Sequence, residues 1–201
     1  MSKDTRTDKR LEWLNKFYMG YMRDVHSAEI AQEALSMREE IRQLIEQSKP
    51  PVGERGEELV AEELRKREFE VRNLGKARYY DLIAKKGNKE TWVQVKTVKS
   101  GDFQLQAIKF LKIDIIDGKQ AVKGKQPPID QESVWVFVKL AEPNEFYLLR
   151  KGEVQDFVFR RYSFDLEKIG GERPKNRYSF HHAIAVRDLK EWKDNWKILE
   201  S

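Results

Sequence analysis

The sequence predicts an α/β protein in which helices flank a mixed central β-sheet, with a helical arm on the N-terminal side. Two observations lead to this class. Apolar residues recur at three- and four-residue steps over residues 8–48 and 54–66, which indicates amphipathic helices. Between residues 69 and 149, short apolar or alternating segments indicate strands. Helix and strand patterns therefore share one chain, with no internal repeat.

The first part of the chain, residues 1–49, is predicted to be a helical arm or hairpin. Its two apolar runs are expected to form two helices that meet near residues 24–27, with Ser27 as an N-cap. The pair Pro50-Pro51 then interrupts the helical pattern. Residues 1–50 carry nine basic and nine acidic side chains. This balance favours packing on the main domain or on a second subunit over contact with DNA.

The second part, residues 50–201, is predicted to be one domain. Its expected elements in chain order are a helix at 54–66, a short alternating segment at 69–72, strands at 79–85 and 91–98, an irregular strand and Gly/Lys-rich loop at 101–126, strands at 133–140 and 145–149, a helix at 153–161, a basic loop at 170–177, a strand at 183–186 and a helix at 187–199. The two strands on either side of residues 86–89 are expected to form a β-hairpin.

Composition narrows the class of protein. The chain has 201 residues and no cysteine, which excludes disulfide scaffolds, cysteine-ligated metals and thiol nucleophiles. It contains no run of about 18 apolar residues, the length of a membrane span. The opening residues lack the apolar core of a signal peptide. We therefore expect a soluble cytoplasmic protein that does not enter a membrane.

Positive charge is concentrated in the middle of the chain. The segment Arg72–Lys125 holds thirteen basic and five acidic side chains, a net charge of +8, whereas the whole chain carries +5. Such a segment is typical of a surface that binds a polyanion. A solvated surface rich in Lys and Glu is the alternative that composition leaves open.

Polar residues interrupt the apolar hairpin at three places. Asp81 directly precedes the apolar run Leu82-Ile83-Ala84, and a carboxylate there is costly unless it is paired or binds a cation. In the next strand the period of two places Gln94 and Lys96 on one face. A short hairpin brings Asp81 close to both.

A fourth candidate lies on the preceding helix. At 100° per residue, Glu57 falls in the middle of the apolar face formed by Val60, Ala61 and Leu64. A glutamate that points to the core is rarely left unpaired.

Oxygen ligands from Asp81, Gln94 and Glu57, with the Val95 carbonyl, suit Mg²⁺ or Mn²⁺. Lys96 would orient or help to deprotonate a water bound to the metal. Two simpler interpretations stay open. Asp81 and Lys96 could form a plain cross-strand ion pair, and Glu57 could pair with Arg78 or Lys96 without any metal.

Three segments together resemble the core motifs of the PD-(D/E)xK nuclease superfamily, which includes many restriction endonucleases and the archaeal Holliday-junction resolvases. These segments are Gly56–Ala61, Tyr80–Ala84 and Val93–Thr97. The resemblance covers residues 53–100 and, in outline, the strands up to about residue 140; the arm and a C-terminal elaboration, residues 141–201, lie outside it. It implies a restriction-endonuclease-like fold and Mg²⁺-dependent cleavage of DNA.

The resemblance assigns roles residue by residue. Asp81 takes the place of the motif's aspartate, and Lys96 that of its lysine. Gln94 stands where the second acid is usual, and Glu57 matches the glutamate of the first helix. Tyr80 stands in the proline position, which is loose in such families. The amide of Gln94 can ligate a metal but brings no charge, so it weakens the expected affinity.

The first hypothesis is therefore a metal-dependent endonuclease that hydrolyses DNA phosphodiesters with a metal-activated water. Cutting both strands needs two sites, so we expect a homodimer, with a partner subunit as a further source of specificity. The alternative is a nucleic-acid-binding module or complex subunit with weak or no cleavage, which Gln94 favours. The expected DNA contacts are Lys76, Arg78, Lys99, Lys109, Arg173, Lys175 and Arg177. His181 and His182 are adjacent on an extended segment, so they point to opposite faces and are expected to be structural or to contact phosphate.

Overall fold

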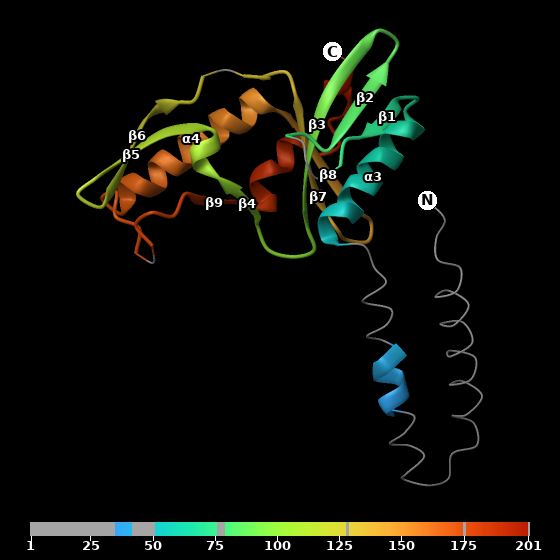
Figure 1. Cartoon of the computed structure of the whole chain (residues 1–201), viewed down its shortest axis with the longest axis horizontal. Helices are drawn as coiled ribbons and strands as arrows, with labels where there is room; N and C mark the ends of the chain where they lie inside the picture. Colours follow the sequence, from blue (N-terminus) through green and yellow to red (C-terminus); the bar gives the residue numbers. More distant parts are fainter. Residues whose placement is uncertain (1–34, 42–50, 76–78, 128, 175, 201) are drawn as a thin grey trace. The chain divides into compact units, whose positions relative to one another are not determined.

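A computed structural model of the chain describes residues 35–41, 51–75, 79–127, 129–174 and 176–200 (Figure 1). The chain divides into two compact units, Met1–Pro51 and Val52–Ser201. In the first unit, residues 35–41 are helical, and Pro51 is the one other described residue. The remainder of the arm that the sequence predicts lies outside the described residues.

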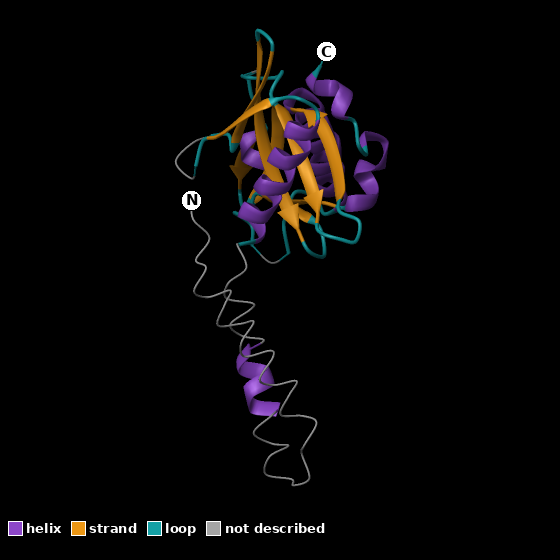
Figure 2. Cartoon of the chain, turned by 90° about the vertical axis from the view of Figure 1, so that its right-hand side faces the viewer, coloured by secondary structure: helices purple, strands orange, loops and turns teal. Residues whose placement is uncertain are grey.

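The second unit is built on a mixed five-stranded sheet. Its order is β1 (Glu70–Asn73), β2 (Leu82–Lys86), β3 (Lys89–Val98), β7 (Val134–Lys139) and β8 (Glu145–Arg150). β3 and β7 are parallel, whereas every other neighbouring pair in this sheet is antiparallel. Figure 2 shows these strands side by side with helices packed beside them. The α/β class and the mixed sheet that the sequence predicts are therefore confirmed.

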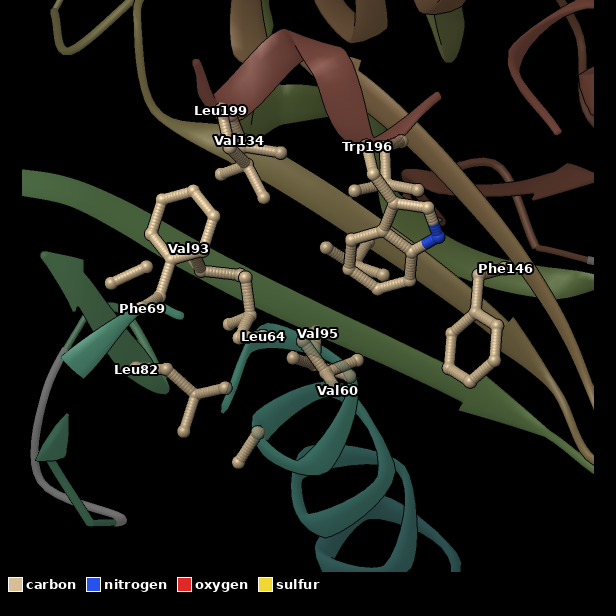
Figure 3. Close-up of a cluster of buried hydrophobic side chains, with 14 of the residues drawn as sticks. Val60, Leu64, Phe69, Leu82, Val93, Val95, Val134, Phe146, Trp196 and Leu199 are labelled. Carbon is tan, nitrogen blue, oxygen red and sulfur yellow. The ribbon is translucent and has the colours of Figure 1, made fainter. Parts of the chain in front are cut away.

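One face of this sheet is covered by helix α3 (Val52–Lys66). Val60 and Leu64 of α3 point toward Val93 and Val95 of β3 (Figure 3), and all four belong to one buried apolar cluster. Trp196, from the short 3₁₀ segment η3 (Trp196–Leu199), closes the same cluster. The alternation of β3 sets this face, because every second residue from Thr91 to Val95 is buried.

A second apolar cluster lies against the opposite face of the sheet. It joins Trp135 and Phe137 of β7 to Val158 and Tyr162 of helix α4 (Lys151–Lys168). Two small two-stranded sheets complete this side. One pairs β4 (Phe103–Gln106) with β9 (His181–Ile184), and the other pairs β5 (Leu111–Ile116) with β6 (Lys119–Lys125). The 3₁₀ segment η1 (Ala107–Lys109) connects β4 to β5, and η2 (Val186–Trp192) follows β9.

Two expectations about local structure were wrong. Residues 101–126 form β4, η1 and the β5–β6 hairpin instead of an irregular strand and loop. The hairpin turns at Asp117 and Gly118, both with positive φ, which is the geometry of a type I′ turn. The last segment forms two 3₁₀ pieces instead of one helix, and Asp194 between them has a φ of 53°.

No helix in the described part of the chain is long and apolar enough to cross a membrane.

Glycine at position 56 allows α3 to approach β3 closely. A Cβ atom on Gly56 would lie 1.8 Å from Thr97 Oγ1, far inside van der Waals contact. Gly53, in the first turn of the same helix, has nothing within 4 Å of the equivalent position. The two glycines therefore have different roles within one helix.

We predict that Gly56→Ala destabilises the domain by about 1–3 kcal/mol, the usual cost of overpacking. Gly53→Ala should be neutral or slightly stabilising, because alanine favours helix. Since Thr97 supplies all three close contacts, Gly56→Ala/Thr97→Ala should recover part of the loss. Denaturant unfolding measures all three variants. Equal stability of Gly56→Ala and Gly53→Ala would contradict this account of the helix contact.

Candidate active site

The candidate site lies where β3 changes its pairing partner. β3 pairs with β2 from Lys89 to Val93 and with β7 from Val93 to Val98. Past Val93, no strand among the described residues pairs with the edge of β3 that faces β2. Asp81, the residue before β2 begins, lies at this changeover, opposite Gln94 in the antiparallel register.

Beyond the end of β2, the Asp81 side chain accepts hydrogen bonds from β3. The backbone N–H of Asp81 donates to the Val93 carbonyl at 3.0 Å. The Val95 N–H donates to Asp81 Oδ2 at 2.6 Å, and the Gln94 amide nitrogen donates to the same oxygen. The carboxylate is thus fixed by backbone and side chain of β3 together.

The Val95 carbonyl completes a cluster of oxygen atoms. In a strand the N–H and C=O of one residue point to the same edge, so the Val95 carbonyl faces the open edge beside Asp81. Gln94 Nε2 also lies 3.4 Å from the Val95 oxygen. The amide nitrogen therefore lies between the Asp81 carboxylate and the Val95 carbonyl, and a half-turn of the amide would present its oxygen there instead.

The oxygen atoms of Asp81, Val95 and Gln94 are suitable ligands for a hard cation. A carboxylate, a backbone carbonyl and an amide that can turn its oxygen inward are the ligand types that Mg²⁺ and Mn²⁺ take in proteins. Among the described residues, no three His, Asp or Glu side chains form a group that could hold a metal ion. The candidate set therefore depends on Gln94 and the Val95 carbonyl as well as on carboxylates.

Lys96 lies on the same face of β3 as Gln94, over the aromatic ring of Trp135. Its Nζ is 5.8 Å from the centre of the Trp135 ring. Within the described residues, Lys96 makes no ion pair or hydrogen bond. The direct Asp81–Lys96 ion pair that the sequence left open as an alternative is thus not formed in this structure.

Burial shifts both titratable groups toward neutrality. Loss of hydration lowers the pKa of Lys96 below its ordinary value; the Lys109 charge adds to this, whereas Asp81 and Glu57 oppose it. Burial also raises the pKa of Asp81, against the Val95 N–H and the Lys96 charge, which favour the carboxylate. A lysine whose ammonium form is disfavoured can accept a proton more readily than an exposed one.

Glu57 lies on the other side of the sheet from Gln94 and Lys96. It belongs to α3, which packs on the Val93 and Val95 face, whereas Gln94 and Lys96 point to the opposite face. Glu57 is half-buried, and its charge acts on Lys96. Its alternative partner, Arg78, lies outside the described residues.

The residues expected to contact DNA do not all gather here. Lys99 is exposed just past the end of β3, and Lys109 in η1 is close enough to act on the charge of Lys96. The loop that follows α4, described at residues 170–174 and 176–180, lies at the far end of the domain from the β2–β3 hairpin (Figure 1). On that loop Arg177 pairs with Glu172 at 3.1 Å, and the Arg173 guanidinium lies over the Tyr162 ring. Lys76, Arg78 and Lys175 lie outside the described residues.

The two adjacent histidines point to opposite faces of β9, as the extended segment predicts. His181 is exposed, whereas His182 is 5% exposed and its ring packs edge-on against Tyr162.

Sequence reasoning missed Trp135. Parallel pairing of β3 with β7 places it directly beside Gln94, where its ring underlies Lys96. The sequence Ser133–Leu140 shows that Trp135 and Phe137 lie on one face of a strand. It does not show which strand pairs with it or in which register.

No family model matches this chain, and no curated protein matches it either. Among solved structures, the fold is similar to that of a bacterial homing endonuclease, I-Ssp6803I, at 15% sequence identity and a TM-score of 0.45. The match covers 74% of this chain and 91% of that one.

We predict that Lys96→Met makes the domain more stable than the wild type at pH 7. The pKa of Lys96 is lower in the folded chain than its ordinary value of 10.5. Between these two pKa values the folded state therefore binds fewer protons than the unfolded state. Wild-type stability should therefore rise with pH from the lowered pKa up to about 10.5, and this rise should be absent from Lys96→Met.

Lys112→Met, which replaces an exposed lysine on β5, is the matched control and should leave stability and its pH dependence unchanged. Denaturant midpoints between pH 6 and 10 decide the matter. A Lys96→Met variant that is less stable at pH 7 would show that the ammonium is stabilised, not strained, by its surroundings.

Proposed function

We propose that this protein is a metal-dependent endonuclease that hydrolyses phosphodiester bonds in DNA. The observation that carries the proposal is the position of Lys96. It is a half-buried lysine without an ion-pair partner in the described residues, and it has a lowered pKa. It lies on one sheet face with Gln94, two residues beyond the position opposite Asp81. A purely structural lysine is more stable when it is paired or exposed.

In this proposal the oxygen cluster holds the metal. Asp81 Oδ2 and the Val95 carbonyl are the fixed ligands, because the backbone of β3 positions both. Gln94 contributes its amide oxygen after the half-turn described above, and Glu57 supplies a second carboxylate. When bound, Mg²⁺ or Mn²⁺ neutralises charge on the phosphate and makes water more acidic.

Lys96 handles the proton. In its neutral form Nζ accepts a proton from the water that attacks phosphorus. The bond from phosphorus to the leaving oxygen breaks, and that oxygen keeps the electron pair and takes a proton from solvent. The resulting ammonium is then stabilised by the charges of Asp81 and Glu57, both of which favour the charged form of this lysine. Lys109 and Lys99, on the rim, favour a phosphate backbone over a neutral substrate.

A second candidate function is DNA binding without cleavage. The observation that favours it is the Gln94 amide nitrogen, which donates to Asp81 and also lies 3.4 Å from the Val95 oxygen. In that position a hydrogen-bond donor bridges the two oxygens, and the cluster is satisfied without a cation. The same surface would then bind DNA through its basic residues alone.

A cleavage assay separates the two functions. On supercoiled plasmid with Mg²⁺ or Mn²⁺, we expect nicking by the wild type and a loss of about 10²–10⁴-fold in rate for Lys96→Ala and for Asp81→Asn. Lys112→Ala is the matched control and should cleave normally. Salt-sensitive DNA binding with no nicking in either metal would favour the second candidate, and nicking that survives Asp81→Asn would remove the site proposed here.

Replacing Gln94 by glutamate tests the metal set without an activity assay. Gln94→Glu removes the donor to Asp81 and places two carboxylates together, so the metal-free protein should be less stable. Added Mn²⁺ should raise the melting temperature of Gln94→Glu more than that of the wild type. Gln104→Glu, at an exposed position on β4, is the control. An equal metal response in all three proteins would contradict ligation at position 94.

A further inference from the structure

An aromatic pair lies directly beside the candidate site on the same face of the sheet. Trp92 precedes Gln94 and Lys96 at alternate positions of β3, so all three point to one side. One such step along a strand is about 7 Å. The Tyr80 ring, next to Asp81 in the chain, packs against Trp92 with ring centres 5.5 Å apart.

This pair is held in place but not covered. The Tyr80 hydroxyl donates to Asp130 Oδ2 at 3.1 Å, which fixes the orientation of the phenol ring. Trp92 nevertheless keeps 44% of its surface exposed, and the neighbouring Tyr79 keeps 91%. Ile83, its partner on β2, is 3% exposed, so the outer surface of Trp92 stays open to solvent beside a buried neighbour.

A cation completes the row. Arg72 of β1 pairs with Ile83 of β2, and Ile83 pairs with Trp92 of β3, so the three side chains share one face in a line across the sheet. Arg72 is exposed. The row therefore offers an aromatic ring face and a guanidinium, one row away from Asp81 and Gln94.

These groups together match a nucleotide whose base is not paired. A ring face can stack on any base, but in a duplex the base faces are hidden and only the edges reach the grooves. A guanidinium beside the ring suits the phosphate of the same or the next nucleotide. Asp130 opposes a phosphate at the Tyr80 end, so the phosphate belongs on the Arg72 side.

Resting on the proposed function, we propose that Trp92, Tyr80 and Arg72 form a platform that stacks an unpaired nucleobase next to the phosphodiester to be cut. The substrate class is then DNA with unpaired nucleotides at the cleavage point, such as a bulge, a flap or a single strand. Fully paired duplex binds through its phosphates alone.

Binding without divalent cations tests the platform separately from cleavage. Three fluorescein-labelled DNAs of one sequence are compared by anisotropy in EDTA: a duplex, the same duplex with a two-nucleotide bulge, and the single strand. We expect the wild type to bind the bulge and the single strand more tightly than the duplex. Trp92→Leu should lose about 5- to 150-fold of that affinity, the equivalent of about 1–3 kcal/mol for one stacked base, with no effect on the duplex.

Matched variants separate stacking from general effects. Trp92→Phe keeps a ring and should lose less than Trp92→Leu. Phe164→Leu removes an exposed aromatic side chain on α4, 48% exposed, and should change nothing. In the wild type, the fluorescence of 2-aminopurine at the bulge should be quenched on binding. A DNA with an abasic bulge should bind like the duplex. Both measurements use the wild type, so they do not depend on whether a variant folds.

Equal affinity of the wild type for all three DNAs, or unquenched 2-aminopurine, overturns the platform. Cleavage that is indifferent to Trp92→Leu on every substrate also overturns it and leaves the nuclease intact. Conversely, a preference for unpaired bases that Trp92→Leu abolishes, in a protein that cuts no DNA with Mg²⁺ or Mn²⁺, supports the platform and rejects the nuclease.

Discussion

The hydrogen bond from the Val95 N–H to the Asp81 carboxylate is the interaction on which the site depends. β2 is five residues long and β3 is ten, and β2 pairs with β3 only as far as Val93, while β7 pairs along the other edge of β3. At that point a side chain replaces the backbone of β2 as the acceptor. Among the described residues, the β2-facing edge of β3 beyond Val93 has no strand beside it, and the Val95 carbonyl and the candidate residues Gln94 and Lys96 lie along this stretch of β3.

The apolar sheet around this edge determines the properties of its polar groups. α3 and η3 bury one face of β3, and the aromatic side chains of β7 lie beneath the other. Little water therefore reaches Asp81 or Lys96, and burial moves the pKa of each toward its neutral form. In the proposed function, the same packing that costs stability would let Lys96 take up a proton more readily.

Much of the site was predictable because it follows from local periodicity. The alternation of Val93 to Lys96 places Gln94 and Lys96 on one face, and a short hairpin with Gly87 in its turn brings Asp81 opposite them. Helical spacing likewise placed Glu57 on the inner side of α3. The motif resemblance rests on these same residues, and their roles in catalysis remain predictions.

What sequence could not supply depends on pairing between distant strands. Trp135 lies beside Gln94 only because β7 joins β3 in parallel, some forty residues later in the chain. The β5–β6 hairpin was missed although Asp117-Gly118 is a turn signal, since the lysines and glycines around it read as loop. The row of Arg72, Ile83 and Trp92 also depends on two registers at once, β1 with β2 and β2 with β3, which no single segment encodes.

The central claim is that Asp81, Val95 and Gln94 form one cation site, and anomalous scattering from a crystal soaked with Mn²⁺ tests it most directly. The account predicts a manganese peak in contact with Asp81 Oδ2 and the Val95 carbonyl, with the Gln94 amide turned so that its oxygen faces the ion and Lys96 unpaired nearby. An absent peak, with Gln94 Nε2 still donating to Asp81, would contradict it.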